Sequence, residues 1–142
     1  MKSKFENLTG ICASCDAMAE PVFLLDSNIC IYLLQGAVQG LNARVRAQRR
    51  GSLAVSAISY AEVRLGIRAP EAEQALQGFL RDVLLLPFDG AAAEAYARLP
   101  FRRARLDRLI AAQALAAGLT LITNNERDFA DIPDLRIENW TL

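Results

Sequence analysis

Short, continuously apolar segments alternate with longer helical segments along most of this sequence, and this pattern restricts the fold more than any other feature. Strands are predicted at residues 22–25, 53–56, 83–87, 120–123 and 135–138. Strands that are apolar at nearly every position are typical of a parallel sheet with both faces covered. We therefore expect an α/β fold, a three-layer α/β/α sandwich around a central, mostly parallel sheet of four or five strands.

Helices are predicted between these strands, and several of their ends are marked by capping residues. Asn28 is expected to cap a helix over 29–34 that ends at Gly36. Ser59 and Glu62 have the spacing of a capping box, which predicts a helix from there to about residue 67. Asp89 is expected to cap the helix that follows it. The remaining helices are predicted at 37–50, 71–82, 90–99 and 106–117.

The chain has 142 residues, with sixteen basic and sixteen acidic side chains and no histidine. This length predicts one domain, which we place at residues 21–142 after an N-terminal extension over 1–20. The absence of histidine excludes His-based acid–base catalysis and zinc sites built on imidazole. Both lysines lie in the first four residues, so a phosphoacceptor signalling domain, which needs a lysine beside its acidic pocket, is also excluded.

Two further features concern the environment of the chain. Cys12 and Cys15 form a C-x-x-C pair without a second pair, which favours reduced thiols over a zinc knuckle or a redox motif. The first twenty residues lack the apolar core of a secretory signal. No apolar run reaches the roughly 18 residues of a membrane span. Together these observations predict a cytoplasmic protein with no membrane association.

Four acidic residues follow predicted strands or lie in the helices after them: Asp26, Glu62, Asp107 and Asp128. Since the carboxyl ends of parallel strands share one edge of the sheet, we expect these carboxylates to converge there. Grouped carboxylates repel one another unless a cation neutralises them, and an all-oxygen site suits Mg²⁺ or Mn²⁺. Three of these acids also have a purely structural alternative, as a helix-capping residue for Glu62, a helix-dipole partner for Asp107 and a solvated loop acid for Asp128.

Five segments, in this order, resemble the PIN-domain family and, within it, the VapC ribonuclease toxins of bacterial toxin–antitoxin pairs. They are LLDSNI at 24–29, SYAEVRLG at 59–66, LLPFD at 85–89, LDRLIAAQA at 106–114 and LITNNERDF at 121–129. The resemblance covers about residues 22–142 and includes the closing RIENW at 136–140. It implies a PIN-like fold and a magnesium-dependent endoribonuclease, in which Mn²⁺ substitutes for Mg²⁺.

The resemblance also implies roles for individual residues. The first three acids of the family match Asp26, Glu62 and Asp107, which makes all three candidate catalytic residues and metal ligands. Asp26 and Asp107 are favoured as the direct metal contacts. The expected reaction is in-line attack on an RNA phosphodiester by water that the metal ion activates, leaving a 5′-phosphate and a 3′-hydroxyl.

The fourth acidic position departs from the family pattern. Many members have an aspartate in a Thr-x-Asp segment, whereas this chain has Asn125, with Asp128 three residues later. Two interpretations stay open: Asn125 orients a water molecule while Asp128 adds negative charge, or Asp128 takes the place of the missing acid. Thr123 or Ser27 is expected to assist by hydrogen bonding. The departure also keeps an alternative function open, a catalytically impaired PIN-like module that binds RNA or protein.

The basic residues are grouped in two arginine-rich segments. Residues 44–50 carry four arginines and no acid, and residues 98–108 carry five arginines against one acid. Because phosphate contacts drive nucleic-acid binding, the second segment is the candidate RNA contact. Its candidate RNA-binding residues are Arg102, Arg103, Arg105 and Arg108.

Protein partners follow in part from apolar surface. The helices at 29–34 and 60–67 are expected to leave an apolar groove between them, of the kind that binds another protein. The resemblance implies that this partner is a cognate antitoxin, which inhibits the toxin by placing an arginine or another blocking group in the acidic site. It also implies a toxin homodimer or a toxin–antitoxin hetero-oligomer.

Overall fold

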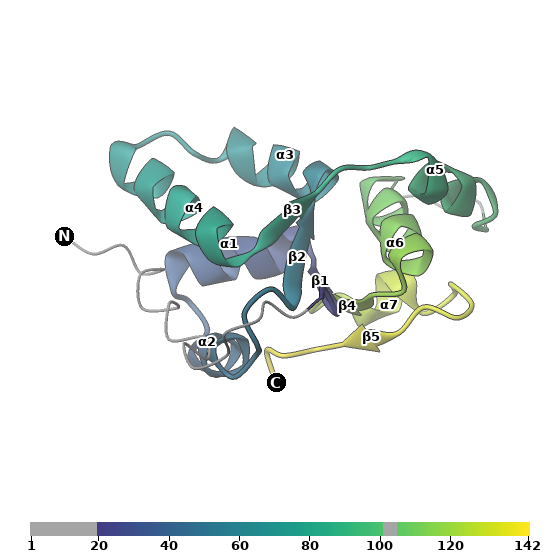
Figure 1. Ribbon diagram of the computed structural model, residues 1–142. Helices are drawn as coiled ribbons and strands as arrows, with labels where there is room; N and C mark the ends of the chain where they lie inside the picture. The colour runs from purple at the N-terminus through teal and green to yellow at the C-terminus, as the bar shows by residue number, and fades with distance from the viewer. Residues whose placement is uncertain (1–19, 101–104) are drawn as a thin grey trace.

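A computed structural model describes residues 20–100 and 105–142 (Figure 1). The segment with Cys12 and Cys15 lies outside the described residues, as do Arg102 and Arg103. In the described part, a five-stranded sheet has the order β3-β2-β1-β4-β5, and every neighbouring pair is parallel. Its strands are β1 (Phe23–Leu25), β2 (Leu53–Ser56), β3 (Leu84–Leu86), β4 (Thr120–Ile122) and β5 (Ile137–Glu138). The predicted α/β sandwich is therefore confirmed.

Helices cover both faces of this sheet. They are α1 (Ser27–Gln35), α2 (Gln39–Arg46), α3 (Ala57–Leu65), α4 (Pro70–Asp82), α5 (Gly90–Ala97), α6 (Arg105–Ala117) and α7 (Glu126–Phe129). In Figure 1, α1, α3 and α4 lie on one side of the strands, and α5, α6 and α7 lie on the other. The short helix α7 was not among the predicted helices.

Alternate residues of the central strands pack into two halves of the core, one on each face of the sheet. Leu25 and Val55 pack with residues of α1 to α4, including Ile29 and Phe79. Leu24 and Ala54 face the opposite side and pack with residues of α6 and α7, including Ile110. Because successive side chains of a strand point to opposite faces, apolar residues at every position are needed to bury both faces.

Two predicted helix starts are wrong. Helix α1 begins directly after β1, and its N-cap is Asp26, whose carboxylate accepts from the Ser27 N–H; Asn28 lies inside the helix. Helix α3 is capped by Ser56, whose hydroxyl accepts from the Ile58 N–H, so Ser59 lies inside the helix and forms no capping box. In both cases the helix follows the strand without a loop. The N-cap is therefore the polar residue at the end of the strand, Asp26 after β1 and Ser56 in β2.

The start of α5 and the ends of α1 and α6 are as predicted. The Asp89 carboxylate accepts from the Ala92 N–H at 2.9 Å and caps α5. Gly36 and Gly118 follow α1 and α6 with φ angles of 65° and 68°, a left-handed conformation that glycine adopts without a Cβ clash. Helix α2 is shorter than the predicted 37–50, because the chain turns after Arg46 to enter β2. No helix in the described ranges is long and apolar enough to cross a membrane.

Candidate active site

The strand order places a topological switch point between β1 and β4. From β1 the chain adds β2 and β3 on one side, then crosses to add β4 and β5 on the other side. In open parallel sheets, ligands bind outside the carboxyl ends of the strands at such a point. Asp26 follows β1 there and Thr123 follows β4 there. The polar residues predicted to share one edge of the sheet therefore start from neighbouring strands.

Asp26 is held by two hydrogen bonds. Its Oδ1 accepts from the Ser27 N–H at 2.7 Å, and its Oδ2 accepts from the Thr123 hydroxyl at 2.8 Å. Asp26 is 3% exposed and Thr123 is fully buried, so the carboxylate has little freedom to turn. Burial raises the pKa of Asp26, while the hydrogen bonds from Thr123 and Ser27 act in the opposite direction.

Glu62 reaches the same place from α3. The hydroxyl of Ser27 donates to Glu62 Oε1 at 2.7 Å, although the two residues are 35 positions apart. Ser27 is buried and follows Asp26 directly. One short segment after β1 therefore orients both carboxylates, Asp26 through the Ser27 backbone and Glu62 through the Ser27 side chain.

Asp107 lies in the first turn of α6 and completes the acidic group. Its pKa is raised to about 6, first by partial burial and then by the negative charges of Asp26, Asp128 and Glu62, while Arg108 acts in the opposite direction. The charges of Asp26, Glu62 and Asp128 all act on Asp107, so each of these three acids lies within electrostatic range of it. Within residues 20–100 and 105–142, however, no three acidic or cysteine side chains are close enough to hold one metal ion between them.

Asn125 and Asp128 both belong to the segment that follows β4. The Asn125 N–H donates to the Thr123 hydroxyl at 3.0 Å, so this residue is fixed beside the partner of Asp26. Asn125 occupies the N-cap position of α7, but its side chain makes no capping hydrogen bond. Asp128 lies in α7 and its N–H donates to the Asn125 carbonyl at 3.1 Å. Both side chains are exposed next to the buried Thr123.

Tyr32 is a polar neighbour of the site that sequence reasoning missed. Its hydroxyl accepts from the side-chain amide of Asn124 at 3.0 Å, which joins α1 to the segment after β4 across 92 positions. The Asn124 Oδ1 atom is buried without a hydrogen-bond partner. A signal was present in the sequence, because Tyr32 is the one side chain with a hydroxyl in the apolar run 29–34.

Arg108 is the one predicted RNA-contacting arginine whose side chain lies within the described residues. It is only 7% exposed, and its Nη2 donates to Asp131 Oδ1 at 2.8 Å and to Oδ2 at 3.0 Å. In this structure the Arg108 guanidinium is thus directed inward. The arginines at 44–50 are exposed, and Arg44 lies over the Trp140 ring, 5.2 Å from its centroid.

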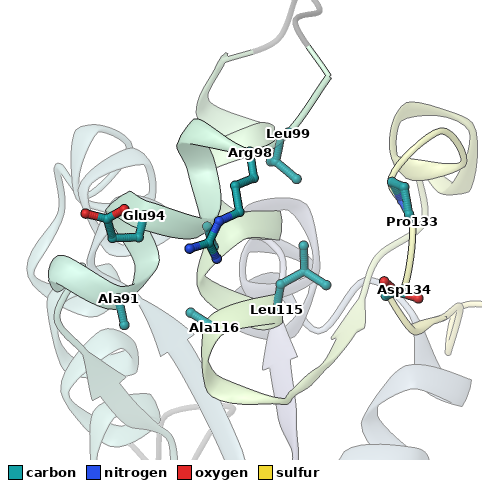
Figure 2. Close-up of a pocket in the computed structure, with 9 residues that line it drawn as sticks. Ala91, Glu94, Arg98, Leu99, Leu115, Ala116, Pro133 and Asp134 are labelled. Atoms are coloured by element: carbon teal, nitrogen blue, oxygen red, sulfur yellow. The ribbon is translucent and has the colours of Figure 1, made fainter.

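Two surface cavities differ in whether any of the four acids lines them. A groove of about 230 Å³ lies between α1, α3 and α4, with Glu62 among its lining residues. A cleft of about 490 Å³ lies between α5, α6 and the segment before β5, and contains none of the four acids. Figure 2 shows Arg98 and Leu115 in this cleft, with Pro133 and Asp134 on the opposite wall. Cavity size alone therefore does not locate the acidic site.

The sequence matches the PIN domain family over residues 23–135. It is 30% identical to the tRNA(fMet)-specific endonuclease VapC of Shigella flexneri, over 84% of this chain and 98% of the relative. It is 28% identical to Ribonuclease VapC2 of Rickettsia felis, with the same coverage.

Solved structures of similar fold are toxin–antitoxin assemblies. VapBC2 of Rickettsia felis bound to a promoter DNA fragment has a TM-score of 0.69 and 27% identity, over 84% of this chain and 98% of that one. A toxin–antitoxin complex from Klebsiella pneumoniae has a TM-score of 0.67 and 27% identity, over 82% and 96%. The fold, the group of acids and these matches agree: the chain belongs to the VapC family of PIN-domain ribonuclease toxins of toxin–antitoxin systems.

Proposed function

We propose that the chain is an endoribonuclease that depends on Mg²⁺, with Mn²⁺ as a substitute, and hydrolyses RNA phosphodiester bonds. The observation that carries this proposal is the mutual repulsion of the acids, which contributes to raising the pKa of Asp107 to about 6. Carboxylates that repel one another are stabilised by a cation, and the side chains that hydrogen-bond to Asp26 and Glu62 are the hydroxyls of Thr123 and Ser27. No imidazole or thiolate ligand is involved, which fits a hard divalent ion.

The side chains present fit a magnesium ion in one particular way. No three carboxylates are close enough for direct ligation of a single ion in the described parts of the chain. Mg²⁺ usually binds one or two carboxylates and keeps several waters. We assign Asp26 and Asp107 as the direct contacts, with Glu62 acting through a bound water. When bound, the ion supplies an activated water molecule and neutralises charge that develops on the phosphate.

The remaining polar residues prepare the site for that ion. The Thr123 hydroxyl and the Ser27 N–H hold both oxygens of Asp26, and the Ser27 hydroxyl holds Glu62. These fixed donors reduce the reorganisation needed when phosphate enters. Asp128 adds negative charge from α7, and the exposed Asn125 amide is placed to hydrogen-bond a water. Three arginines of the 98–108 segment, Arg102, Arg103 and Arg105, are proposed to contact the RNA backbone.

Asp26→Asn is the central test of the catalytic proposal. The variant keeps the size of the side chain but removes its charge, so we expect RNA cleavage to fall by about 100-fold or more while the protein stays folded. Asp134→Asn makes the same chemical change on the exposed segment before β5 and serves as the control. Cleavage of a defined RNA is measured with Mg²⁺, with Mn²⁺ and after exhaustive chelation.

Two results would overturn the proposal. Full activity of Asp26→Asn would remove Asp26 from catalysis, and activity that survives chelation would remove the metal ion. RNA binding without cleavage by the wild-type protein would instead support the impaired binding module. Products with 5′-phosphate ends are expected and are identified by ligation-based sequencing.

We also propose that the groove between α1, α3 and α4 binds a helix of a cognate antitoxin. Its lining is mostly apolar, with Ile31 and Leu34 from α1, Val63 from α3 and Ala72 from α4. The similar structure from Klebsiella pneumoniae, which is 27% identical, is a toxin–antitoxin complex. A helix in this groove would lie next to Glu62, so its end would be able to block the acidic site.

Ala72→Glu tests this partner site. The substitution places a charge in the apolar groove, so binding of the antitoxin encoded beside this chain should weaken at least tenfold, while RNA cleavage stays at the wild-type rate. Affinity is measured by calorimetry, and the mass of the toxin alone and of the complex distinguishes a homodimer from a hetero-oligomer. Unchanged affinity would place the antitoxin elsewhere.

A further inference from the structure

Arg108 occupies a position that is unfavourable for a cation. It lies in the first turn of α6, where the helix dipole favours negative charge, and it is only 7% exposed. Burial of a charged group is costly unless the charge is paired and hydrogen-bonded. The contacts that Arg108 makes must therefore compensate for both effects.

Asp131 provides the pairing. The Arg108 Nη2 donates to both carboxylate oxygens of Asp131, at 2.8 and 3.0 Å. Asp131 lies between Phe129 and Ile132, which are 1% and 5% exposed and pack into the half of the core beneath α6. The carboxylate is thus attached to a firmly anchored stretch of backbone. The ion pair joins the first turn of α6 to the segment that follows α7.

This link connects two of the candidate site acids. Asp107 directly precedes Arg108, and Asp128 precedes Asp131 by three residues. The other guanidinium nitrogen, Nη1, is buried and has no hydrogen-bond partner. In this conformation Nη2 bonds to Asp131 and Nη1 is buried, which distinguishes Arg108 from the exposed arginines of the chain.

We infer that Arg108 is a positioning residue, which through its ion pair with Asp131 fixes Asp107 relative to Asp128 and does not contact RNA. This inference rests on the proposed function, because it concerns the placement of the proposed metal-binding acids. It replaces the expectation that Arg108 binds the RNA backbone. A misplacement of about 1 Å in such a site lowers a rate by about 100-fold, so loss of the pair has a measurable effect.

The test compares Asp131→Asn, Arg108→Gln and Arg108→Lys with wild type, and uses Asp134→Asn as the matched control on the same segment. We expect kcat for RNA cleavage to fall at least about tenfold in Asp131→Asn and Arg108→Gln, with KM within about twofold of wild type. Arg108→Lys keeps a cation that is able to reach Asp131 and should recover most of kcat. Mn²⁺ binding, measured by calorimetry without RNA, should weaken several-fold in Asp131→Asn but not in Asp134→Asn.

Other results would overturn the inference. If Arg108 binds phosphate, Arg108→Gln raises KM and lowers the slope of binding against salt concentration by about one, while Asp131→Asn has neither effect. If the pair only stabilises the fold, Asp131→Asn lowers the Tm but leaves kcat and Mn²⁺ affinity unchanged well below that temperature. Failure of the wild-type protein to cleave RNA with Mg²⁺ contradicts the proposed function instead, and the Mn²⁺ titration still compares the variants.

Discussion

Asp107→Asn should stabilise the metal-free protein at high pH and have almost no effect at low pH. The pKa of Asp107 is raised from its usual 3.8 to about 6 in the folded state, so the folded protein binds this proton more tightly than the unfolded chain does. Below pH 3.8 the Asp107 carboxyl is protonated in both the folded and the unfolded state, so it does not lower the stability. As the pH rises from 3.8 through about 6, ionisation becomes more costly in the folded state, and stability falls.

The size of this effect follows from the same two values. A tenfold change in proton affinity corresponds to about 1.4 kcal/mol, so the full difference between 3.8 and about 6 corresponds to roughly 3 kcal/mol. Asp107 is only partly buried, and solvent screening reduces this to on the order of 1 kcal/mol. Asparagine carries no charge, so the unfolding free energy of the variant should exceed that of wild type by this amount at about pH 8, where Asp107 is ionised.

Urea denaturation at about pH 4.5 and about pH 8, without divalent cations, measures the difference between the two proteins. Glu73 also makes the stability depend on pH: hydrogen bonds from Arg64 lower its pKa, so its contribution to stability is lost as the pH decreases. Both proteins share this contribution, and comparing wild type with the variant removes it. Added Mg²⁺ should then stabilise wild type more than the variant, because the ion relieves the repulsion at Asp107. An equal difference in unfolding free energy at both pH values would refute the reasoning.

Five substitutions, at Thr123, at Leu24 and near the start of α3, test other parts of the structure. Thr123→Val removes the hydrogen bond to the Asp26 carboxylate, worth about 1.5–3 kcal/mol, so RNA cleavage should fall about 10- to 100-fold, and Thr123→Ser should retain most of it. Leu24→Ala leaves a cavity at a fully buried position of β1 and should lower the unfolding free energy, measured in urea, by about 2–5 kcal/mol. Ser56→Ala removes the cap of α3 and should cost about 1 kcal/mol, whereas Ser59→Ala, whose hydroxyl has no partner, should cost less.

The helix caps show which helix starts the local sequence predicts correctly and which it does not. The Asp89 cap of α5 was predicted correctly, because an acidic residue followed by a run of alanines leaves only one good place for the helix to begin. The capping box at Ser59 was wrong, although its spacing was correct, because Ser56 at the end of β2 caps the helix three residues earlier. Glu62 is consequently free of a capping role and bonds to Ser27 instead. The S-x-x-E spacing at Ser59 therefore does not locate the start of the helix, which depends on where β2 ends.

The acids of the candidate site were predicted as a group from the sequence, whereas their hydrogen-bond partners were not. Asp26 and Asp107 were identified because a charge at the end of a buried strand or at the start of an apolar helix has no packing role. The hydrogen bond between Thr123 and Asp26 joins residues 97 positions apart, and the one between Asn124 and Tyr32 joins residues 92 apart. Such contacts depend on which strands become neighbours, and no local pattern carries that information.

Burial and periodicity are properties of short segments, so the alternation of buried strands and helices and the parallel sheet followed from the sequence alone. Only the tertiary structure decided the order β3-β2-β1-β4-β5, which makes β1 and β4 neighbours and lets Thr123 meet Asp26. It also decided that Arg108 turns inward to Asp131. An arginine in a helical turn is compatible with solvent or with a buried carboxylate, and the choice depends on the segment that packs beside it.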